Sequence, residues 1–185
     1  DAIRKKGSIG TMNFYYDARL VDDQFNDVPE GKTGELWLYG PTVTPGYWKN
    51  EKETREAIRD GWFRTGDLMR KDNDGYYYVI DRIKNMYISG GENVYPAEVE
   101  HFIGKHPAVA DVAIIGVPHE KWGETGKAYI VKKKREKITE KNIKEYCLGN
   151  IAKYKTPTNI EFLDELPKND AGKNERKKLR QMHQK

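Results

Sequence analysis

Two short motifs carry residue types that could bind a nucleotide. In WFRTGDL, residues 62–68, Asp67 follows a Thr-Gly turn at the end of a predicted strand. A carboxylate placed there can accept two hydrogen bonds from the diol of a ribose. In DRIKNMYISGG, residues 81–91, Arg82 and Lys84 flank a break between two sequence patterns, and the planar fork of the arginine could hold ribose or phosphate oxygens. Taken alone, each motif is also typical of a surface loop or a charged linker.

A third motif lies near the C-terminus, where Lys173 follows a glycine in LPKNDAGKNERKKLR. Glycine lets the backbone turn sharply, so we expect the ammonium group of Lys173 to lie on a mobile loop that can enter a site held by another domain. The alternative interpretation is a basic tail that solvates the end of the chain.

The glycine pair in MYISGGENVYP, residues 86–96, stands where a phosphate-binding loop would lie in a nucleotide enzyme. No GK[ST] follows this pair, and the candidate phosphate-binding lysine is far downstream at Lys173. The sequence therefore favours a turn at Ser89, Gly90 and Gly91 over a phosphate cradle.

The composition of the 185-residue chain, with 34% charged, 37% hydrophobic and 11% aromatic residues, indicates a folded globular protein. No apolar run approaches the roughly 20 residues of a membrane-spanning helix, and no segment has the layout of a signal peptide, so we expect a cytoplasmic protein. The four histidines show no metal-ligand spacing with each other or with Cys147, and we predict no protein-held metal. Cys147 is predicted to be a buried, inert thiol.

Two patterns of predicted elements position these motifs. The first part of the chain is β-rich, with strands at 18–22, 34–40 and 74–81 and a charged helix at 51–59. Strands and helices then alternate, with helices at 96–104 and 139–150 and strands at 109–117, 126–133 and 159–166. The change of pattern predicts a domain boundary near residues 81–85 and a small α+β domain after it.

Together, in this order and spacing, the motifs resemble the C-terminal portion of the adenylate-forming enzymes, the superfamily of acyl- and aryl-CoA synthetases, luciferases and peptide-synthetase adenylation domains. The resemblance covers nearly the whole chain, including GSIG at residues 7–10 and VPEGKTGELWLYGPTVTPGYW at residues 28–48. It implies an α+β architecture. Residues 1–82 would be the β-rich end of the large N-terminal AMP-binding domain, a distorted barrel, and residues 83–185 the mobile C-terminal domain.

The resemblance implies an ATP-dependent, AMP-forming acid-thiol ligase. Such an enzyme activates a fatty, aryl or short carboxylic acid with ATP to acyl-AMP, with Mg²⁺ accompanying ATP, and then transfers the acyl group to CoA. Asp67 and Arg82 would bind ATP or AMP, and Lys173 would be the catalytic lysine that bridges the carboxylate and the α-phosphate. Lys84 would be the hinge about which the C-terminal domain rotates between the two half-reactions.

The same resemblance assigns a CoA path to the C-terminal domain. Ser89, Gly90 and Gly91 would line the pantetheine arm, because glycines leave the backbone bare. Trp122 and Tyr154 would stack on the CoA nucleotide, although both could be ordinary core or surface aromatics.

Three positions depart from the family pattern and weaken the CoA details more than the adenylation chemistry. Asn85 stands where an acidic residue is common, Tyr87 replaces a more usual aliphatic residue, and Thr156 stands where some relatives have a basic residue.

The phosphate loop, the adenine-binding motif and the acyl pocket of the family would all precede this sequence. We therefore expect a fragment, an excised piece or a truncated product that depends on the missing N-terminal part and is inactive alone. The alternative is a non-catalytic CoA-binding or partner-docking module. Nucleic-acid binding through the basic residues 173–180 ranks last, because no aromatics interleave with them. The acid, the acceptor thiol and the oligomeric state are not specified by the sequence.

Overall fold

The computed structural model describes residues 4–184, which form two compact units. The first unit ends at Lys84 and the second begins at Asn85. The division thus falls two residues after the boundary between 82 and 83 that the sequence suggests. It lies within a short 3₁₀ helix, η1, which spans Ile83–Asn85.

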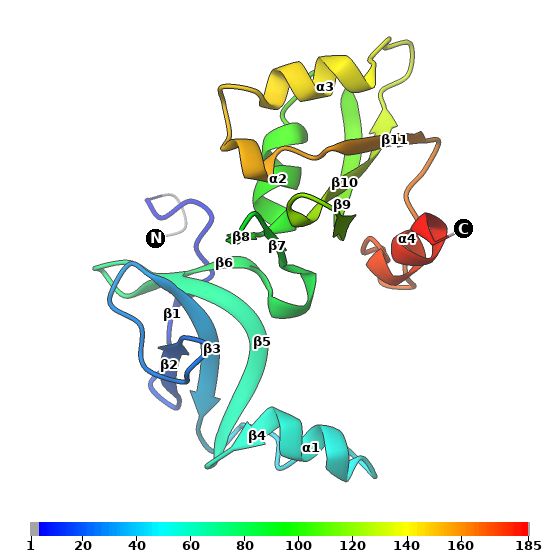
Figure 1. The fold of residues 1–185 in the computed structure, drawn as a ribbon. Coiled ribbons are helices and arrows are strands. Elements are labelled where there is room, and N and C mark those ends of the chain that lie inside the picture. Colours follow the sequence, from blue (N-terminus) through cyan, green and yellow to red (C-terminus); the bar gives the residue numbers. More distant parts are fainter. Residues whose placement is uncertain (1–3, 185) are drawn as a thin grey trace. The chain divides into compact units, whose positions relative to one another are not determined.

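The first unit is an antiparallel sheet in the order β1-β6-β5-β3-β2, with β4 paired to β5 (Figure 1). Leu36, Met69 and Tyr77 form its core. Asn50 caps the helix α1 by accepting a hydrogen bond from the backbone of Glu53 at 3.2 Å. The elements are β1 (Gly10–Thr11), β2 (Asp17–Val21), β3 (Thr33–Tyr39), α1 (Glu51–Ala57), β4 (Ile58–Arg59), β5 (Trp62–Lys71) and β6 (Tyr76–Arg82).

Strand β5 corrects one sequence expectation, since Asp67 lies inside this ten-residue strand and not at its end. The Thr-Gly pair nevertheless marks an irregular place. Gly66 has a φ of 70°, and the register of β5 against β6 shifts between Leu68 and Met69. Such irregularities bend a strand and redirect its side chains, which explains why the sequence there looks like a turn.

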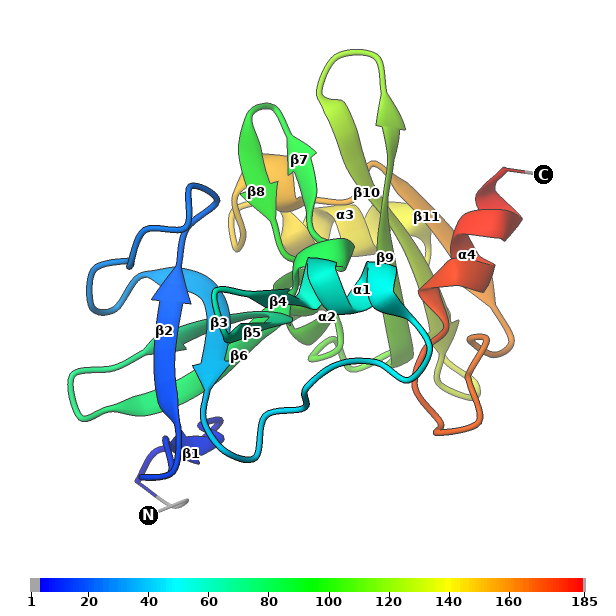
Figure 2. The ribbon, with the colours of Figure 1, turned by 90° about the horizontal axis from the view of Figure 1, so that it is seen from below.

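The second unit contains a sheet in the order β11-β10-β7-β8, with β9 paired to β10. Figure 2 shows its two hairpins, β7–β8 and β9–β10. The β10–β11 pair is parallel, whereas the other pairs are antiparallel. The elements are β7 (Tyr87–Ser89), β8 (Glu92–Val94), α2 (Pro96–Ile103), β9 (Val109–His119), β10 (Gly123–Lys132), α3 (Glu140–Cys147), the 3₁₀ helix η2 (Lys153–Lys155), β11 (Asn159–Leu163) and α4 (Arg176–His183).

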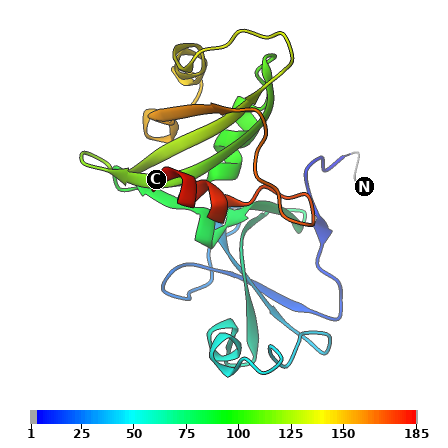
Figure 3. The same cartoon turned by 90° about the vertical axis from the view of Figure 1, so that its right-hand side faces the viewer.

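Alternate residues of β9 are buried on opposite faces of this sheet, as strand geometry requires. Val112 and Ile114 pack into the cluster that holds α2 and α3. Ala113 and Ile115 pack into a second cluster with Leu179 of α4. Helix α4 therefore covers the face opposite α2 and α3 (Figures 1 and 3).

The helices of the second unit begin where the sequence predicts, with one addition. Pro96 is the first residue of α2, and Thr139 forms a capping box with Asn142 at the start of α3. The sequence interpretation did not include α4, because its residues are almost all polar and Leu179 is its one fully buried side chain. No helix among residues 4–184 is long and apolar enough to cross a membrane.

Candidate functional site

The two residues expected to bind ATP or AMP lie opposite each other in the first unit, in β5 and β6. Arg82 Nε donates to Asp67 Oδ1 at 2.7 Å. Asp67 is 23% exposed and Arg82 is 53% exposed, so the pair is accessible to a ligand. A carboxylate oriented by an arginine is suited to accept hydrogen bonds from a sugar diol.

A hollow of about 620 Å³ lies beside this pair and includes Arg82 and Lys84 in its lining. The lining also includes Glu35, which is only 6% exposed. The carboxylate of Glu35 accepts hydrogen bonds from Trp37 Nε1 at 2.9 Å and from the backbone of Gly66 at 3.2 Å. The hollow thus borders the irregular segment that carries Asp67. Its charged lining fits a polar ligand.

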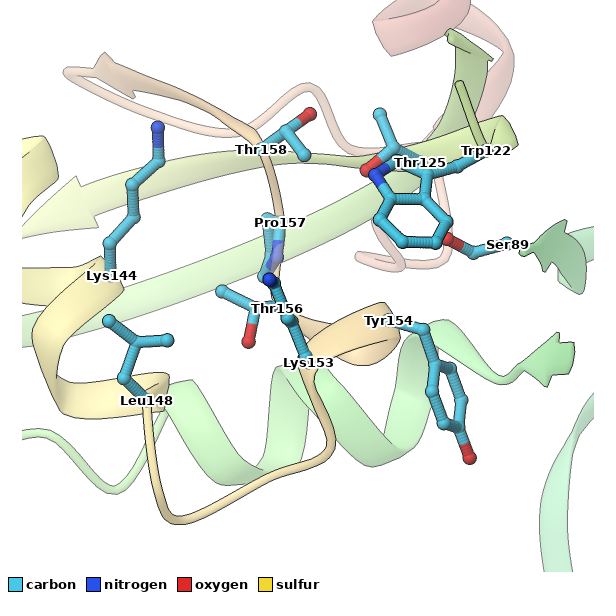
Figure 4. A pocket seen from close by; sticks show the side chains of 10 residues that line it. All are labelled: Ser89, Trp122, Thr125, Lys144, Leu148, Lys153, Tyr154, Thr156, Pro157 and Thr158. Atoms are coloured by element: carbon cyan, nitrogen blue, oxygen red, sulfur yellow. The ribbon is translucent and has the colours of Figure 1, made fainter. Parts of the chain in front are cut away.

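The second unit has a pocket of about 260 Å³ that brings together Ser89, Trp122 and Tyr154, three of the residues expected to bind CoA (Figure 4). They come from β7, from the β9–β10 turn and from η2. In Figure 4, Trp122 and Ser89 lie at one end of the pocket. Tyr154 lies at its edge, with the hydroxyl pointing away from the other labelled side chains.

The other two residues of this set, Gly90 and Gly91, are outside the lining of the pocket. Gly90 contacts a residue of the lining, because its backbone N–H donates to the Trp122 carbonyl at 2.9 Å. A Cβ on Gly90 would lie 2.8 Å from the indole Cε3, and the φ values of 62° and 86° at Gly90 and Gly91 favour glycine. The pair forms the tight turn that the sequence favoured, and the structure adds that this turn contacts Trp122.

Five polar side chains that the sequence interpretation did not assign also line the pocket: Thr125, Lys144, Lys153, Thr156 and Thr158. The hydroxyls of Thr156 and Thr158 are buried without a hydrogen-bond partner among the described residues. Buried hydroxyls normally find a partner, so these two mark a place where water or a ligand belongs. No sequence signal marks them, because threonines are common in polar segments such as KTPT, residues 155–158.

Lys173 lies in a short hairpin of the second unit, residues 167–175. It is not among the residues that line the pocket around Trp122, which we call the Trp122 pocket. Its carbonyl accepts from the Asn169 backbone at 2.9 Å, and its own N–H donates to Asn169 Oδ1 at 2.9 Å. An isolated bridge pairs Lys168 with Asn174. The segment predicted to be a loop forms a hydrogen-bonded turn, and Gly172, with a φ of 73°, supplies its left-handed residue.

The comparison with known proteins gives the class. Residues 1–48 match the family described as AMP-binding enzyme, and residues 98–173 match the AMP-binding enzyme C-terminal domain. These consecutive matches define part of an AMP-binding enzyme.

The chain belongs to the adenylate-forming acyl-CoA synthetase family, as the resemblance of its motifs implied. It is 44% identical to a feruloyl-CoA synthase from Amycolatopsis over 91% of its own length and 34% of that protein. It is 42% identical to a 2-succinylbenzoate–CoA ligase of Listeria monocytogenes over all of its length and 37% of that protein. The chain thus spans about a third of the curated relatives it matches.

A solved structure agrees in fold. The o-succinylbenzoate CoA synthetase of Bacillus subtilis, bound to its acyl-adenylate intermediate OSB-AMP, matches with a TM-score of 0.88 and 36% identity. The match covers 96% of this chain and 36% of that one. The predicted α+β architecture, a curled β sheet followed by an α+β unit, is confirmed.

Proposed function

We propose that this chain is the C-terminal part of an ATP-dependent acyl- or aryl-CoA ligase that forms acyl-AMP and passes the acyl group to CoA. The observation that carries the proposal is the Trp122 pocket, because three residues expected at a CoA site converge there from distant parts of the sequence. The identity to CoA ligases over 91% to 100% of the chain supports the same reaction class.

In the adenylation half-reaction, Asp67 and Arg82 would hold the ribose of ATP or AMP. Their 2.7 Å ion pair supports this role, since it orients the carboxylate before a ligand arrives. Lys173 would place its ammonium group between the carboxylate and the α-phosphate, where a well-placed donor is worth about 10²- to 10³-fold in rate. Mg²⁺ would enter with the ATP phosphates, since it binds through few protein ligands.

In the thioester half-reaction, the Trp122 pocket would hold CoA, whose thiol supplies the acyl acceptor. The pocket fits such a ligand on chemical grounds. Trp122, Leu148 and Pro157 provide apolar surface for an extended arm. The unpartnered hydroxyls of Thr156 and Thr158 could receive amide or hydroxyl groups.

The lysines of the pocket supply the positive charge that residue 156 lacks. Lys144 and Lys153 both line it, and Lys144 is also paired with Glu140 on its own helix. We assign Lys153 to the phosphates of CoA. Lys84, at the end of the first unit, remains the proposed hinge. The cytoplasm remains the predicted location.

Calorimetric titration of the 185-residue chain at low ionic strength tests the CoA assignment. We expect CoA to bind more tightly than pantetheine, which lacks the phosphates. Lys153→Gln should weaken CoA binding by about two- to fivefold, the range of an exposed ion pair, and should leave pantetheine binding unchanged.

Lys141→Gln is the matched control, because the Lys141 side chain is 82% exposed on α3 and lies outside the pocket lining. It should have no effect on either ligand. Absence of any CoA binding would contradict the pocket assignment. CoA binding that Lys153→Gln leaves intact would contradict only the phosphate contact.

A further inference from the structure

The hairpin that carries Lys173, residues 167–175, is followed directly by Arg176, whose side chain connects it to the rest of the unit. The carbonyl of Pro167 accepts a hydrogen bond from the Glu175 backbone at 2.7 Å, which closes the base of the hairpin. The next residue, Arg176, opens α4 and reaches toward α2 and β9. Lys173 is therefore three positions from a side chain that connects the hairpin to the rest of the unit.

Arg176 is held on two sides by Glu100 and by the backbone of β9. Arg176 Nη2 donates to Glu100 Oε1 at 2.6 Å and to Oε2 at 2.7 Å, and its Nε donates to the Ile114 carbonyl at 3.3 Å. Glu100 Oε1 also accepts from the Ile114 N–H at 2.7 Å. The two side chains are 20% and 16% exposed, so water competes little for these contacts.

We infer that Glu100 and Arg176 are positioning residues that fix the Lys173 hairpin to the second unit. This inference rests on the proposed role of Lys173 in adenylation. We call the Glu100–Arg176 ion pair the tether. With the tether in place, the hairpin moves together with the rest of the unit, and Lys173 keeps a fixed position within it. Without it, the hairpin keeps the ion pair of Lys168 with Asp111 of β9, at 3.3 Å, but loses the Arg176–Glu100 pair that connects it to α2, and Lys173 samples other positions.

The contacts of α4 separate this tether from general stability. The far part of α4 is held independently, because Leu179 is fully buried and its carbonyl accepts from the Tyr129 hydroxyl at 3.1 Å. Removing the Glu100 charge should therefore loosen the hairpin more than the helix. One outcome of breaking a partly buried pair is an uncompensated charge, so Glu100→Gln, which keeps the shape and one acceptor oxygen, is the milder variant.

Helix α2 also offers a matched control. Glu98 forms a second ion pair from the same helix, with Lys155 Nζ at 2.6 and 2.8 Å. Its partner lies in η2 and not in the hairpin. Glu98→Gln makes the same chemical change two positions away without touching the tether.

The first experiment measures amide hydrogen exchange by NMR in the 185-residue chain. In Glu100→Gln we expect the amides of Asn169, Gly172 and Lys173 to exchange about tenfold faster, with β10 amides unchanged. Glu98→Gln should leave the hairpin amides as they are. If Glu100→Gln leaves them unchanged while the chain stays folded, the tether is refuted. If Glu100→Gln unfolds the unit, Arg176→Lys, which keeps the charge but loses the Nε donor to the Ile114 carbonyl, takes its place and the same criterion applies.

The second experiment measures the half-reactions separately after the chain replaces the aligned portion of the Listeria 2-succinylbenzoate–CoA ligase, which matches all 185 residues. Glu100→Gln should slow acyl-AMP formation by about 10- to 100-fold, the cost of a misplaced catalytic group. Thioester formation from supplied acyl-AMP should be unchanged. Glu98→Gln should not slow acyl-AMP formation.

Lys173→Ala in the same protein distinguishes the two proposals. If Lys173→Ala does not slow adenylation, the proposed role of Lys173 fails. If Lys173→Ala slows it but Glu100→Gln does not, only the tether fails. The tether also requires that Glu100→Gln add nothing further in the Lys173→Ala background, whereas a purely structural role of Glu100 would give additive losses.

Discussion

Tyr87, the aromatic residue that departs from the family pattern, packs its side chain against two glycines, Gly116 and Gly126. Its side chain is 2% exposed, and Gly116 of β9 pairs with Gly126 of β10 beside it. A Cβ on Gly126 would lie 2.6 Å from the Tyr87 hydroxyl oxygen and 3.4 Å from Cζ. A Cβ on Gly116 would lie 2.4 Å from Tyr87 Cβ and 2.8 Å from Cγ.

These contacts predict a specific double-mutant result. Gly126→Ala should lower the free energy of unfolding of the second unit by about 1–3 kcal/mol, the usual cost of overpacking a core. Tyr87→Phe removes the oxygen at 2.6 Å and leaves Cζ and Pro157 Cα at 3.4 Å, which is ordinary contact. Adding Tyr87→Phe should therefore recover most of the loss caused by Gly126→Ala.

Tyr87→Phe alone should be neutral or stabilising. The hydroxyl is buried without a hydrogen-bond partner among the described residues, and an unsatisfied buried group costs about 1–3 kcal/mol. Burial also raises the pKa of this hydroxyl, which therefore stays protonated.

Gly116→Ala is the control at the other glycine. Its clash is with Cβ and Cγ of Tyr87, which phenylalanine retains, so Tyr87→Phe should not rescue it. Urea-dependent hydrogen exchange of β9 and β10 amides is the appropriate assay, because a chain of two units need not unfold in one transition. Equal rescue at both glycines, or no loss in Gly126→Ala, would refute the steric reasoning.

Three further predictions concern catalysis and titration. In the Listeria hybrid, Lys173→Ala should depress acyl-AMP formation by about 10²- to 10³-fold and spare transfer from supplied acyl-AMP; equal loss in both steps would contradict the assignment. The hydrogen bond from Lys5 Nζ to Asp72 Oδ2, at 2.8 Å, lowers the pKa of Asp72 to about 2. Because this pKa is lower in the folded chain, ionised Asp72 stabilises the fold above the unfolded pKa of about 4, and this stability is lost as the pH falls through about 2. Asp72→Asn should therefore make the stability of the first unit less dependent on pH between those values. Burial raises the pKa of Cys147 to about 11, so iodoacetamide at pH 8 should alkylate the native chain about 10²-fold more slowly than the urea-unfolded chain, as mass spectrometry can measure.

The sequence predicted most elements because their local signals are strong. The continuous apolar run of β9, the proline that opens α2 and the Thr139 cap of α3 each have a direct physical meaning in the fold. Helix α4 was missed because six of its eight residues are polar and Leu179 is its one buried side chain, which gives no apolar stripe, and tertiary contacts decide its structure.

The candidate sites were predicted as separate residues, and the structure adds their partners. The Asp67–Arg82 contact follows from strand register across a hairpin, which the sequence could not fix because β5 contains a register shift. The Thr156 and Thr158 hydroxyls became visible only through burial, since a threonine in a polar segment carries no signal by itself.

Helix α2 connects the parts of the second unit that the two half-reactions would use. It begins two positions after the β8 strand of the glycine hairpin, which seats Trp122. Glu98 holds Lys155, the neighbour of Tyr154 at the pocket edge, and Glu100 holds Arg176 at the Lys173 hairpin. Because both carboxylates project from α2, the pocket edge and the Lys173 hairpin are both connected to the same short helix. A rotation of this unit about the proposed hinge would thus move the two together, so that withdrawing Lys173 and presenting the CoA pocket would require only one motion.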